Sequence, residues 1–281
     1  MALHQKRYSS QYVDDECQRM TLQHRWIKYN MKGLIFAPID CAKPNMRVLE
    51  SATGNAVWLR DIMLELPRST TFVGTDYTSE WFPRDLPKSI SLSIQSIKEP
   101  WLAEWVSSFD FVYQRLALSS CSRELAKAAV FNLFDLVKPG GWIQLVECDN
   151  CALFGPDEIS KQPAISRFTT LISRCFALVG QYELHHAHRL QDWLAEAGAK
   201  EVHSTVVEIP VGCESLNPEL GIITSVNIVT ILRRLKDLLV GQDIPGLPST
   251  LEEFDEIERG VLYVLDNLGA TQAVRVVYAR K

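Results

Sequence analysis

Evenly spaced small residues, followed along the chain by an acid, mark a stretch of this sequence that is suited to binding a ligand. In VLESATGNAVWLRD, residues 48–61, the small residues are Ala52, Gly54 and Ala56, and Asp76 follows 22 residues after Gly54. Small residues allow a ligand to approach the backbone, and an acid about 20 residues further on can accept hydrogen bonds from ribose hydroxyls. The spacing predicts a nucleoside-binding loop. A plain strand-to-helix turn, with Asp76 capping a helix, is the alternative.

Three neighbouring features qualify this prediction. Alanine permits a close approach when its φ is negative, and it fits poorly where φ must be positive. Glu50, at the end of the preceding strand, can accept a hydrogen bond from an amino group of the ligand or from loop amides, or it is an ordinary strand-end carboxylate. Tyr77, directly after Asp76, can pack on a sugar or a base.

Two ligands fit a loop of this kind, NAD and S-adenosylmethionine. The pyrophosphate of NAD favours a complete glycine set and a helix N-terminus directed at the phosphates. S-adenosylmethionine carries no phosphate, so alanine at two of the three positions disfavours it less. The loop therefore favours S-adenosylmethionine, and an NAD-dependent oxidoreductase is a competing hypothesis.

The elements that must position these residues alternate between strand and helix. Crossover helices are expected at 56–66 and 122–137, and KPGG at 138–141 predicts a turn back into the sheet. Apolar segments typical of buried strands lie at 47–51, 71–76, 90–94, 109–115 and 141–147. This order predicts an α/β fold with a doubly wound, mostly parallel sheet, whose ligands bind beyond the carboxyl ends of the strands.

Helical segments surround the alternating core. We expect residues 1–45 to form an N-terminal helical lid and residues 46–281 to form a Rossmann-like domain, with helical insertions at about 148–190 and 210–270. Within these regions the periodicity predicts helices at 14–35, 162–179, 190–198 and 215–268, the last broken at 241–250, and closing strands at 201–210 and 273–280.

Composition narrows the function classes. The 281 residues carry a net charge of -5, which disfavours nucleic acid as the main partner because phosphate binding needs a basic face. The N-terminus lacks the apolar core of a secretory signal, and no stretch is apolar and long enough to span a membrane.

Seven cysteines, an odd number, fit reduced thiols in a cytoplasmic protein. Cys148 and Cys151 form a CxxC without a second pair, so no metal site is predicted.

Four stretches, taken in order, resemble one enzyme family. RVLESATGNAVWLRDI, FVGTDYTSEWFP, SIKEPWLAEWVSSFDFVYQRL and LFDLVKPGGWIQLVECDN are similar to the class I S-adenosylmethionine-dependent methyltransferases, particularly the fungal secondary-metabolism branch that includes the LaeA-like proteins. The resemblance covers most of the chain. It implies a seven-stranded sheet with a reversed last strand and S-adenosylmethionine at the carboxyl edge.

The resemblance also implies roles for residues at the first two strands. Ala52 and Gly54 would line the methionine end of the cofactor, and Asp76 would hold the ribose. The family's usual acid at the end of the first strand is Asp, and here it is Glu50. Two of the three family glycines are alanine. These departures would weaken cofactor affinity or mark a member that binds the cofactor without using it.

Further contacts are implied at the third and fourth strands. Ser96 and Ile97 would flank the adenine, and Ser96 stands where the family usually has Asp. A serine hydroxyl can still hydrogen-bond the exocyclic amine, with less charge assistance. Gln114 and Arg115 would lie near the transferred methyl group.

The reaction implied is methyl transfer to an oxygen or nitrogen atom of a small secondary metabolite. His24, on the lid helix, and Glu147, at the end of the fifth strand, are the candidate proton acceptors. A packed histidine and a strand-end carboxylate are the alternatives. The altered loop keeps a second function open, a cofactor-binding protein with a non-methylating role as a regulatory partner or a cyclase-type catalyst.

Overall fold

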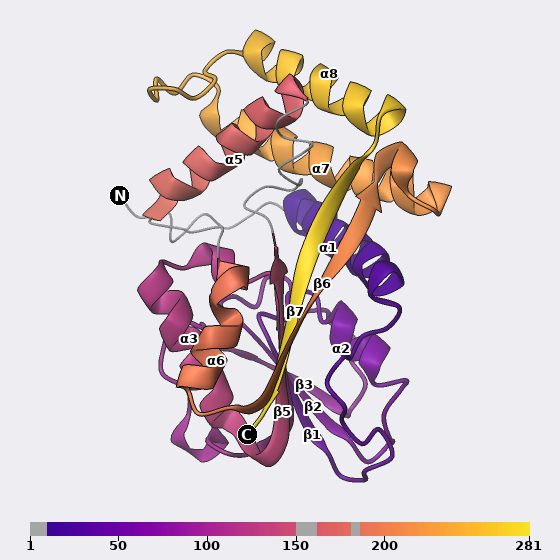
Figure 1. Ribbon diagram of the computed structural model, residues 1–281, viewed down its shortest axis with the longest axis vertical. Helices are drawn as coiled ribbons and strands as arrows, with labels where there is room; N and C mark the ends of the chain where they lie inside the picture. Colours follow the sequence, from indigo (N-terminus) through magenta and orange to yellow (C-terminus); the bar gives the residue numbers. More distant parts are fainter. Residues whose placement is uncertain (1–9, 150–161, 181–185) are drawn as a thin grey trace.

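The strands form one seven-stranded sheet in the computed structural model, which describes residues 10–149, 162–180 and 186–281 (Figure 1). Its strand order is β3-β2-β1-β4-β5-β7-β6, in which β7 runs antiparallel to both neighbours and the other pairs are parallel. The strands are β1 (Arg47–Ser51), β2 (Thr71–Asp76), β3 (Ile90–Ile94), β4 (Phe109–Arg115), β5 (Val137–Cys148), β6 (Lys200–Val211) and β7 (Ala270–Arg280). The predicted doubly wound sheet and its reversed last strand are confirmed.

Helices cover both faces of the sheet. The helices of the described ranges are α1 (Ser10–Met31), α2 (Val57–Ile62), α3 (Arg123–Leu136), α5 (Pro163–Gly180), α6 (Leu190–Glu196), α7 (Pro218–Leu239) and α8 (Leu251–Asn267). Short 3-10 helices lie at η1 (Ala103–Trp105), η2 (Leu118–Ser120), η3 (His186–Arg189) and η4 (Gly212–Glu214). None of the helices in the described ranges is long and apolar enough to cross a membrane.

The sheet separates two hydrophobic cores. Val48 and Trp58 belong to the core on the face that α1 and α2 cover. Leu49, Leu133 and Trp193 belong to the core on the face that α3 and α6 cover. Successive strand residues point to opposite faces, so neighbours such as Val48 and Leu49 enter different cores. This explains why the central strands are apolar almost throughout.

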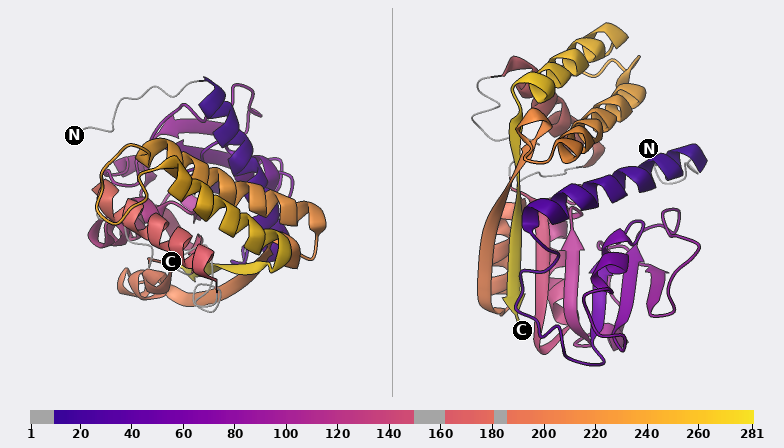
Figure 2. Two further views of the ribbon diagram at one scale, coloured as in Figure 1. Left: turned by 90° about the horizontal axis from the view of Figure 1, so that it is seen from above. Right: turned by 90° about the vertical axis from the view of Figure 1, so that its right-hand side faces the viewer.

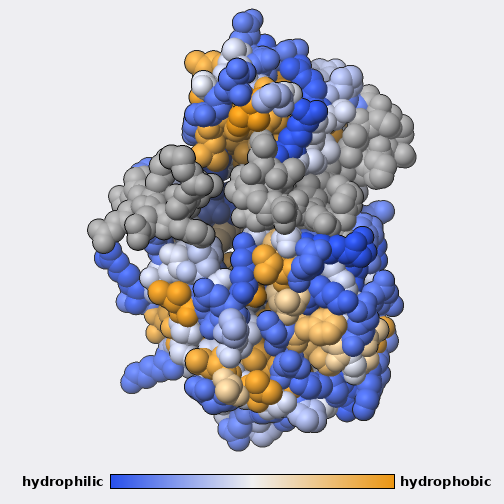
Figure 3. All heavy atoms as spheres, turned by 90° about the vertical axis from the view of Figure 1, so that its left-hand side faces the viewer, coloured by the Kyte–Doolittle hydropathy of each residue, from blue (hydrophilic) through white to orange (hydrophobic). Residues whose placement is uncertain are grey.

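Two sets of elements lie beyond the carboxyl edge of the parallel strands. Helix α1 crosses this edge, as the right-hand view of Figure 2 shows, and it packs against both α2 and α7. Helices α5, α7 and α8 form a cap above the extended ends of β6 and β7, and the cap is a separate upper lobe in the space-filling view (Figure 3). Side-chain caps fix the starts of two cap helices, Asn217 at α7 and the Thr250–Glu253 capping box at α8.

Two local predictions are corrected. The KPGG segment at 138–141 lies within β5 and not in a turn before it, because an irregularity in the pairing with β4 between Phe109 and Phe111 accommodates the extra residues. Gly140 there has a φ of 81°, which glycine adopts without strain. Helix α2 ends at Ile62 and not near residue 66, and turns complete the connection to β2.

Candidate cofactor and active site

The loop after β1 curls tightly at its three small residues. Ala52, Gly54 and Ala56 all have positive φ, at 54°, 54° and 56°. The left-handed region costs a non-glycine residue roughly 1–2 kcal/mol, so both alanines are strained. Backbone hydrogen bonds from Thr53 N to the Thr75 oxygen (2.8 Å) and from Ala56 N to the Thr53 oxygen (3.0 Å) hold the curl. The sequence thus places alanine in a conformation that glycine would adopt freely.

Asp76, at the end of β2, holds this loop directly. Its Oδ2 accepts a hydrogen bond from the Gly54 amide at 2.8 Å. Burial raises the pKa of Asp76, while the amides of Gly54, Thr78 and Tyr77 oppose that rise by donating to the carboxylate. Tyr77 is 59% exposed beside it. The structure therefore joins the two residues of the predicted nucleoside site, Gly54 and Asp76, by a direct contact.

Glu50, at the end of β1, is a buried carboxyl group beside the same loop. It is 5% exposed, and its Oε2 accepts a hydrogen bond from the Thr53 hydroxyl at 2.5 Å. Burial raises the pKa of Glu50 to about 8, with Thr53 and the positive charge of Arg115 opposing the rise and the charge of Asp76 adding to it. Thr53, three residues after Glu50, is a partner that sequence reasoning missed.

His24 links the lid helix α1 to the ends of β4 and α2. Its Nε2 lies 2.8 Å from Asp61 Oδ2, and its Nδ1 lies 3.3 Å from both Nη atoms of Arg115. A guanidinium group can only donate hydrogen bonds, so His24 Nδ1 is the acceptor from Arg115. Nε2 therefore carries the ring proton and donates it in a hydrogen bond to Asp61. Burial and then the Arg115 charge lower the pKa of His24 to about 4. Both ring nitrogens of this neutral histidine are engaged. Asp61 carries no signal in the sequence that identifies it as a partner.

The side-chain amide of Gln114, at the carboxyl end of β4, is buried and only partly hydrogen-bonded. Its Oε1 accepts a hydrogen bond from the Ser51 hydroxyl at 3.1 Å. Its Nε2 is buried and has no hydrogen-bond partner within the described ranges. Buried donors are rarely left unpaired in native proteins, so this amide suits a ligand with an acceptor.

Helix α1 forms the roof over the loop. A Cβ built at Gly54 would lie 2.6 Å from Met20 Sδ, so the Met20 side chain would have to shift if position 54 carried a side chain. Asn55 Nδ2 donates to the Cys17 oxygen at 2.8 Å and to Thr21 Oγ1 at 2.9 Å. The loop, the acids and the buried amide together fit the expected S-adenosylmethionine. Met20 and Asn55 were missed because helix packing against a loop has no local sequence signature.

The predicted adenine residues follow β3. The Gln95 amide donates to the Asp76 carbonyl oxygen at 2.8 Å, which brings this segment beside the end of β2. Ser96 Oγ accepts from the Lys98 amide at 3.2 Å. Ile97 is buried in the core shared with α3. The segment lies next to the acid, and the adenine contact itself stays a prediction.

Glu147, at the end of β5, holds the turn that follows β4. Its Oε1 accepts hydrogen bonds from the amides of Ala117 and Leu118 at 2.9 and 3.0 Å. Leu116, directly before them, has a φ of 52°. Burial raises the pKa of Glu147 to about 7, opposed by these two amides. The catalytic role of Glu147 stays a prediction, and its structural role is visible.

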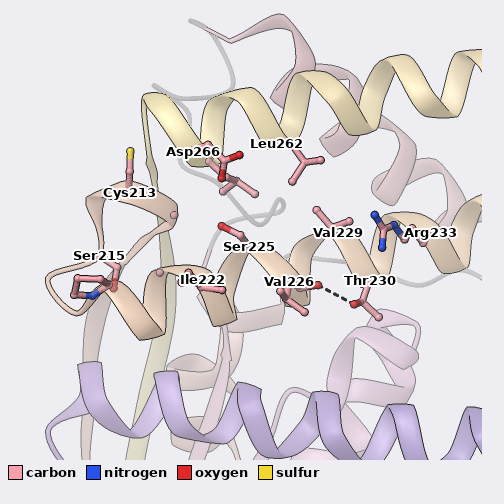
Figure 4. Close-up of a pocket in the computed structure, with 14 residues that line it drawn as sticks. Cys213, Ser215, Ile222, Ser225, Val226, Val229, Thr230, Arg233, Leu262 and Asp266 are labelled. Atoms are coloured by element: carbon pink, nitrogen blue, oxygen red, sulfur yellow. Dashed lines mark hydrogen bonds between the residues drawn. The ribbon is translucent and has the colours of Figure 1, made fainter.

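A pocket lies apart from these residues. A groove of about 520 Å³ runs between α7, α8 and η4, and Ser225, Val229, Leu262 and Asp266 are among the side chains that line it (Figure 4). None of the predicted site residues lines it. Across the described parts of the chain, no three His, Cys, Asp or Glu side chains are grouped to hold a metal ion. Cys151, the second cysteine of the CxxC, lies outside those parts.

Comparison with known proteins relates the whole chain to three fungal proteins. It is 33% identical to the N-methyltransferase gliN of Aspergillus fumigatus, over 98% of this chain and 96% of that protein. It is 33% identical to the N-methyltransferase sirN of Leptosphaeria maculans (99% and 96% covered) and 32% identical to the N-methyltransferase tcpN of Claviceps purpurea (95% and 94% covered). No protein-family model matches the chain.

Solved structures share the fold at low sequence identity. A chain from the complex of the Haloferax volcanii Trm112 methyltransferase activator with a methyltransferase is 12% identical, with a TM-score of 0.51, over 96% of this chain and 95% of that one. An O-methyltransferase family protein from Burkholderia thailandensis is 14% identical, with a TM-score of 0.50, over 70% of this chain and 57% of that one. These likenesses confirm the Rossmann-like architecture.

Proposed function

The chain belongs to the class I S-adenosylmethionine-dependent methyltransferases, in the fungal group that includes gliN, sirN and tcpN, and from this premise we propose that it methylates a nitrogen atom of a small secondary metabolite. One observation carries the choice of nitrogen over oxygen. Three relatives at least 32% identical over at least 95% of this chain are each named N-methyltransferases. In this proposal the cap covers the acceptor.

In this proposal the cofactor binds along the carboxyl ends of β1, β2 and β4. Asp76 holds the ribose and keeps the loop curled, while Ala52 and Gly54 face the methionine end. The buried amide of Gln114 supplies a donor at β4. Ser96 and Ile97 flank the adenine, and Tyr77 covers the sugar. Support comes from the contacts that already join Asp76 to the loop and to the segment after β3.

The chain's own contribution to the reaction is alignment and the exclusion of water. Bound S-adenosylmethionine supplies a methyl group already activated by its sulfonium. The protein must therefore mainly orient the acceptor nitrogen along the C–S bond. A proton leaves the acceptor before or after transfer, and Glu147 is the group we assign to take it. Burial raises the pKa of Glu147 to about 7, which suits a proton acceptor near neutral pH.

His24 has a different part in this proposal. Both of its ring nitrogens already have partners, so it offers no lone pair to an acceptor. We assign it to the lid helix as a positioning residue and leave proton transfer to Glu147.

The test uses cofactor labelled with ¹³C in the methyl group. Purified protein is incubated with this cofactor and metabolite fractions of a fungal culture, and labelled products are followed by mass spectrometry and ¹³C NMR. We expect S-adenosylhomocysteine to form and the labelled carbon to resonate as an N-methyl group. A label on oxygen or carbon would overturn the choice of acceptor atom. Intact cofactor with every fraction would favour the non-methylating alternative.

Asp76→Ala is the variant that tests the site. It removes the ribose acceptor and the loop contact together, and we expect its affinity for S-adenosylhomocysteine to fall by about 100-fold, the effect of losing two or more charge-assisted hydrogen bonds. Asp85→Ala removes an acid just beyond the site, in the loop after Tyr77, and serves as the matched control. Equal affinity in both variants would contradict the assignment.

We also propose three further properties of the protein. They are membership of the LaeA-like branch, a cytoplasmic location, and the division into a lid at 1–45 and a domain at 46–281 with two insertions. The position of α1 across the sheet edge and the three helices of the cap support the last of these.

A further inference from the structure

Arg115 and Glu50 place opposite charges on one face of the sheet. Glu50 pairs with Tyr113 in the register between β1 and β4, and alternate residues of a strand share a face. Glu50, Tyr113 and Arg115 therefore lie on the same side, under α1. The charge of Arg115 reaches Glu50, since it opposes the effect of burial on that carboxyl group. The site thus offers one cation and one acid within electrostatic range of each other.

The lid helix holds the guanidinium in place. His24 Nδ1 accepts from both Nη groups of Arg115, and Asp61 fixes the ring from its other side. Lys28 Nζ lies 2.7 Å from the same Asp61 oxygen and anchors that carboxylate in turn. Because these contacts already hold the Arg115 side chain, less rotamer entropy is lost when it binds a ligand.

The surrounding surfaces suit the charged end of the cofactor. The strained loop lies beside Glu50, and α1 covers the loop through Met20 and through Cys17, whose carbonyl oxygen accepts from Asn55. The methionine part of S-adenosylmethionine ends in an ammonium group and a carboxylate. An arginine fork matches a carboxylate in two parallel hydrogen bonds, and a buried acid matches an ammonium group.

We propose that Arg115 binds the carboxylate of the cofactor's methionine moiety, that Glu50 binds its ammonium group, and that His24 and Asp61 position Arg115. The proposal rests on the placement of the cofactor given above. In it, Arg115 is a specificity residue that reads the end of the cofactor remote from the adenosine. His24 is a positioning residue that acts through Arg115.

Two cofactors that differ only in the carboxylate test the proposal. Calorimetry compares S-adenosylmethionine with decarboxylated S-adenosylmethionine, which keeps the amino group and the sulfonium. The unaltered protein should prefer S-adenosylmethionine by roughly 10- to 100-fold, the effect of losing hydrogen bonds to a charged group. Arg115→Met should reduce this preference to within about twofold, mainly by weakening the binding of S-adenosylmethionine.

Arg60→Met is the matched control. Arg60 lies exposed on α2 and donates to the Asp85 carbonyl oxygen, outside the site. The preference should stay unchanged in this variant. Thermal unfolding of each variant separates a folding defect from a binding defect. If Arg115→Met folds and keeps the full preference, the assignment of Arg115 is wrong.

Two substitutions separate positioning by His24 from simple packing. Asparagine at position 24 keeps an acceptor near the place of Nδ1, whereas leucine removes it and retains the bulk. His24→Leu should lose roughly 5- to 10-fold of the preference, and His24→Asn should restore most of it, since a neutral-to-charged hydrogen bond is at stake. Equal preference in both would show that His24 only packs. Failure of the unaltered protein to bind either cofactor would instead refute the proposed function.

Discussion

Two buried glutamates lie at the carboxyl ends of β1 and β5, the strands on either side of β4, and their surroundings differ. Glu50, on the face covered by α1, bonds a side-chain hydroxyl and faces a cation. Glu147, on the face covered by α3, accepts two backbone amides of the turn after β4. Burial raises the pKa of both. The difference teaches that burial alone does not assign a role. The Thr53 hydroxyl beside Glu50 can exchange for a ligand group, whereas two amides bind Oε1 of Glu147, so this residue supports the turn in addition to the proton-accepting role proposed for it.

The largest expected effect concerns stability. Glu147→Ala leaves the amides of Ala117 and Leu118 without their partner and opens a small cavity, so the free energy of unfolding should fall by roughly 2–4 kcal/mol. Glu50→Ala frees the Thr53 hydroxyl and the Leu59 amide but also removes a costly buried acid, and its loss should be below about 1.5 kcal/mol. Urea unfolding at pH 7 measures both. Equal losses would break the comparison.

The next effect concerns binding. Glu50→Gln keeps the shape but cannot gain the charge that an ammonium group would favour, and affinity for S-adenosylhomocysteine should fall roughly 10-fold. Glu147→Gln should leave that affinity within about twofold, because its oxygen can still accept from the turn. Calorimetry distinguishes the two. A loss confined to the Glu147 variant would reverse the two roles.

The pH dependence of stability sharpens the comparison further. Both carboxyl groups keep their proton to higher pH in the folded chain than in the unfolded chain, where the pKa is near 4.5. The unfolded chain therefore binds fewer protons as pH rises, and their contribution to the free energy of unfolding falls, by at most about 1.4 kcal/mol per pH unit and group.

The two windows end at different pH. The contribution of Glu147 should fall between about pH 4.5 and 7, and that of Glu50 should continue to about pH 8. Unfolding of ligand-free protein at pH 7 and 8 should show a shallower slope for Glu50→Gln and an almost unchanged one for Glu147→Gln. The same slope in the Glu50 variant as in the unaltered protein would contradict the assignment of that window.

The smallest effect concerns the loop itself. Ala52→Gly should raise the free energy of unfolding by about 0.5 kcal/mol, since relief of the left-handed strain slightly exceeds the entropy that glycine adds to the unfolded chain. Ala56→Gly should gain nothing, because Ala56 is fully buried and also loses the burial of its methyl group. A destabilised Ala52→Gly variant would show that the positive φ carries little strain.

Sequence reasoning reached the sheet because its signals are local. Apolar runs and the spacing of Gly54 and Asp76 act within a few residues or one βαβ unit. The alternation of strands and helices was therefore readable. The misplaced KPGG segment shows the limit, since the pairing of β5 with β4 decides its conformation and no local pattern does.

The candidate site could be predicted only in part, because many of its contacts join residues far apart in the sequence. Glu50, Gly54 and Asp76 belong to one motif, and the structure brings them together. The contacts of His24 with Asp61 and Arg115 join residues 37 and 91 positions apart, across a helix packing that a single sequence does not encode locally. The sign of φ at Ala52 likewise depends on the hydrogen bonds that tie the loop to β2.

The two alanines of the loop also have an evolutionary consequence. A single base change converts any alanine codon into a glycine codon, so a glycine at position 52 is always one mutation away. A lineage whose enzyme became marginally stable, for example while its cap adapted to a new acceptor, would have a compensating substitution within immediate reach.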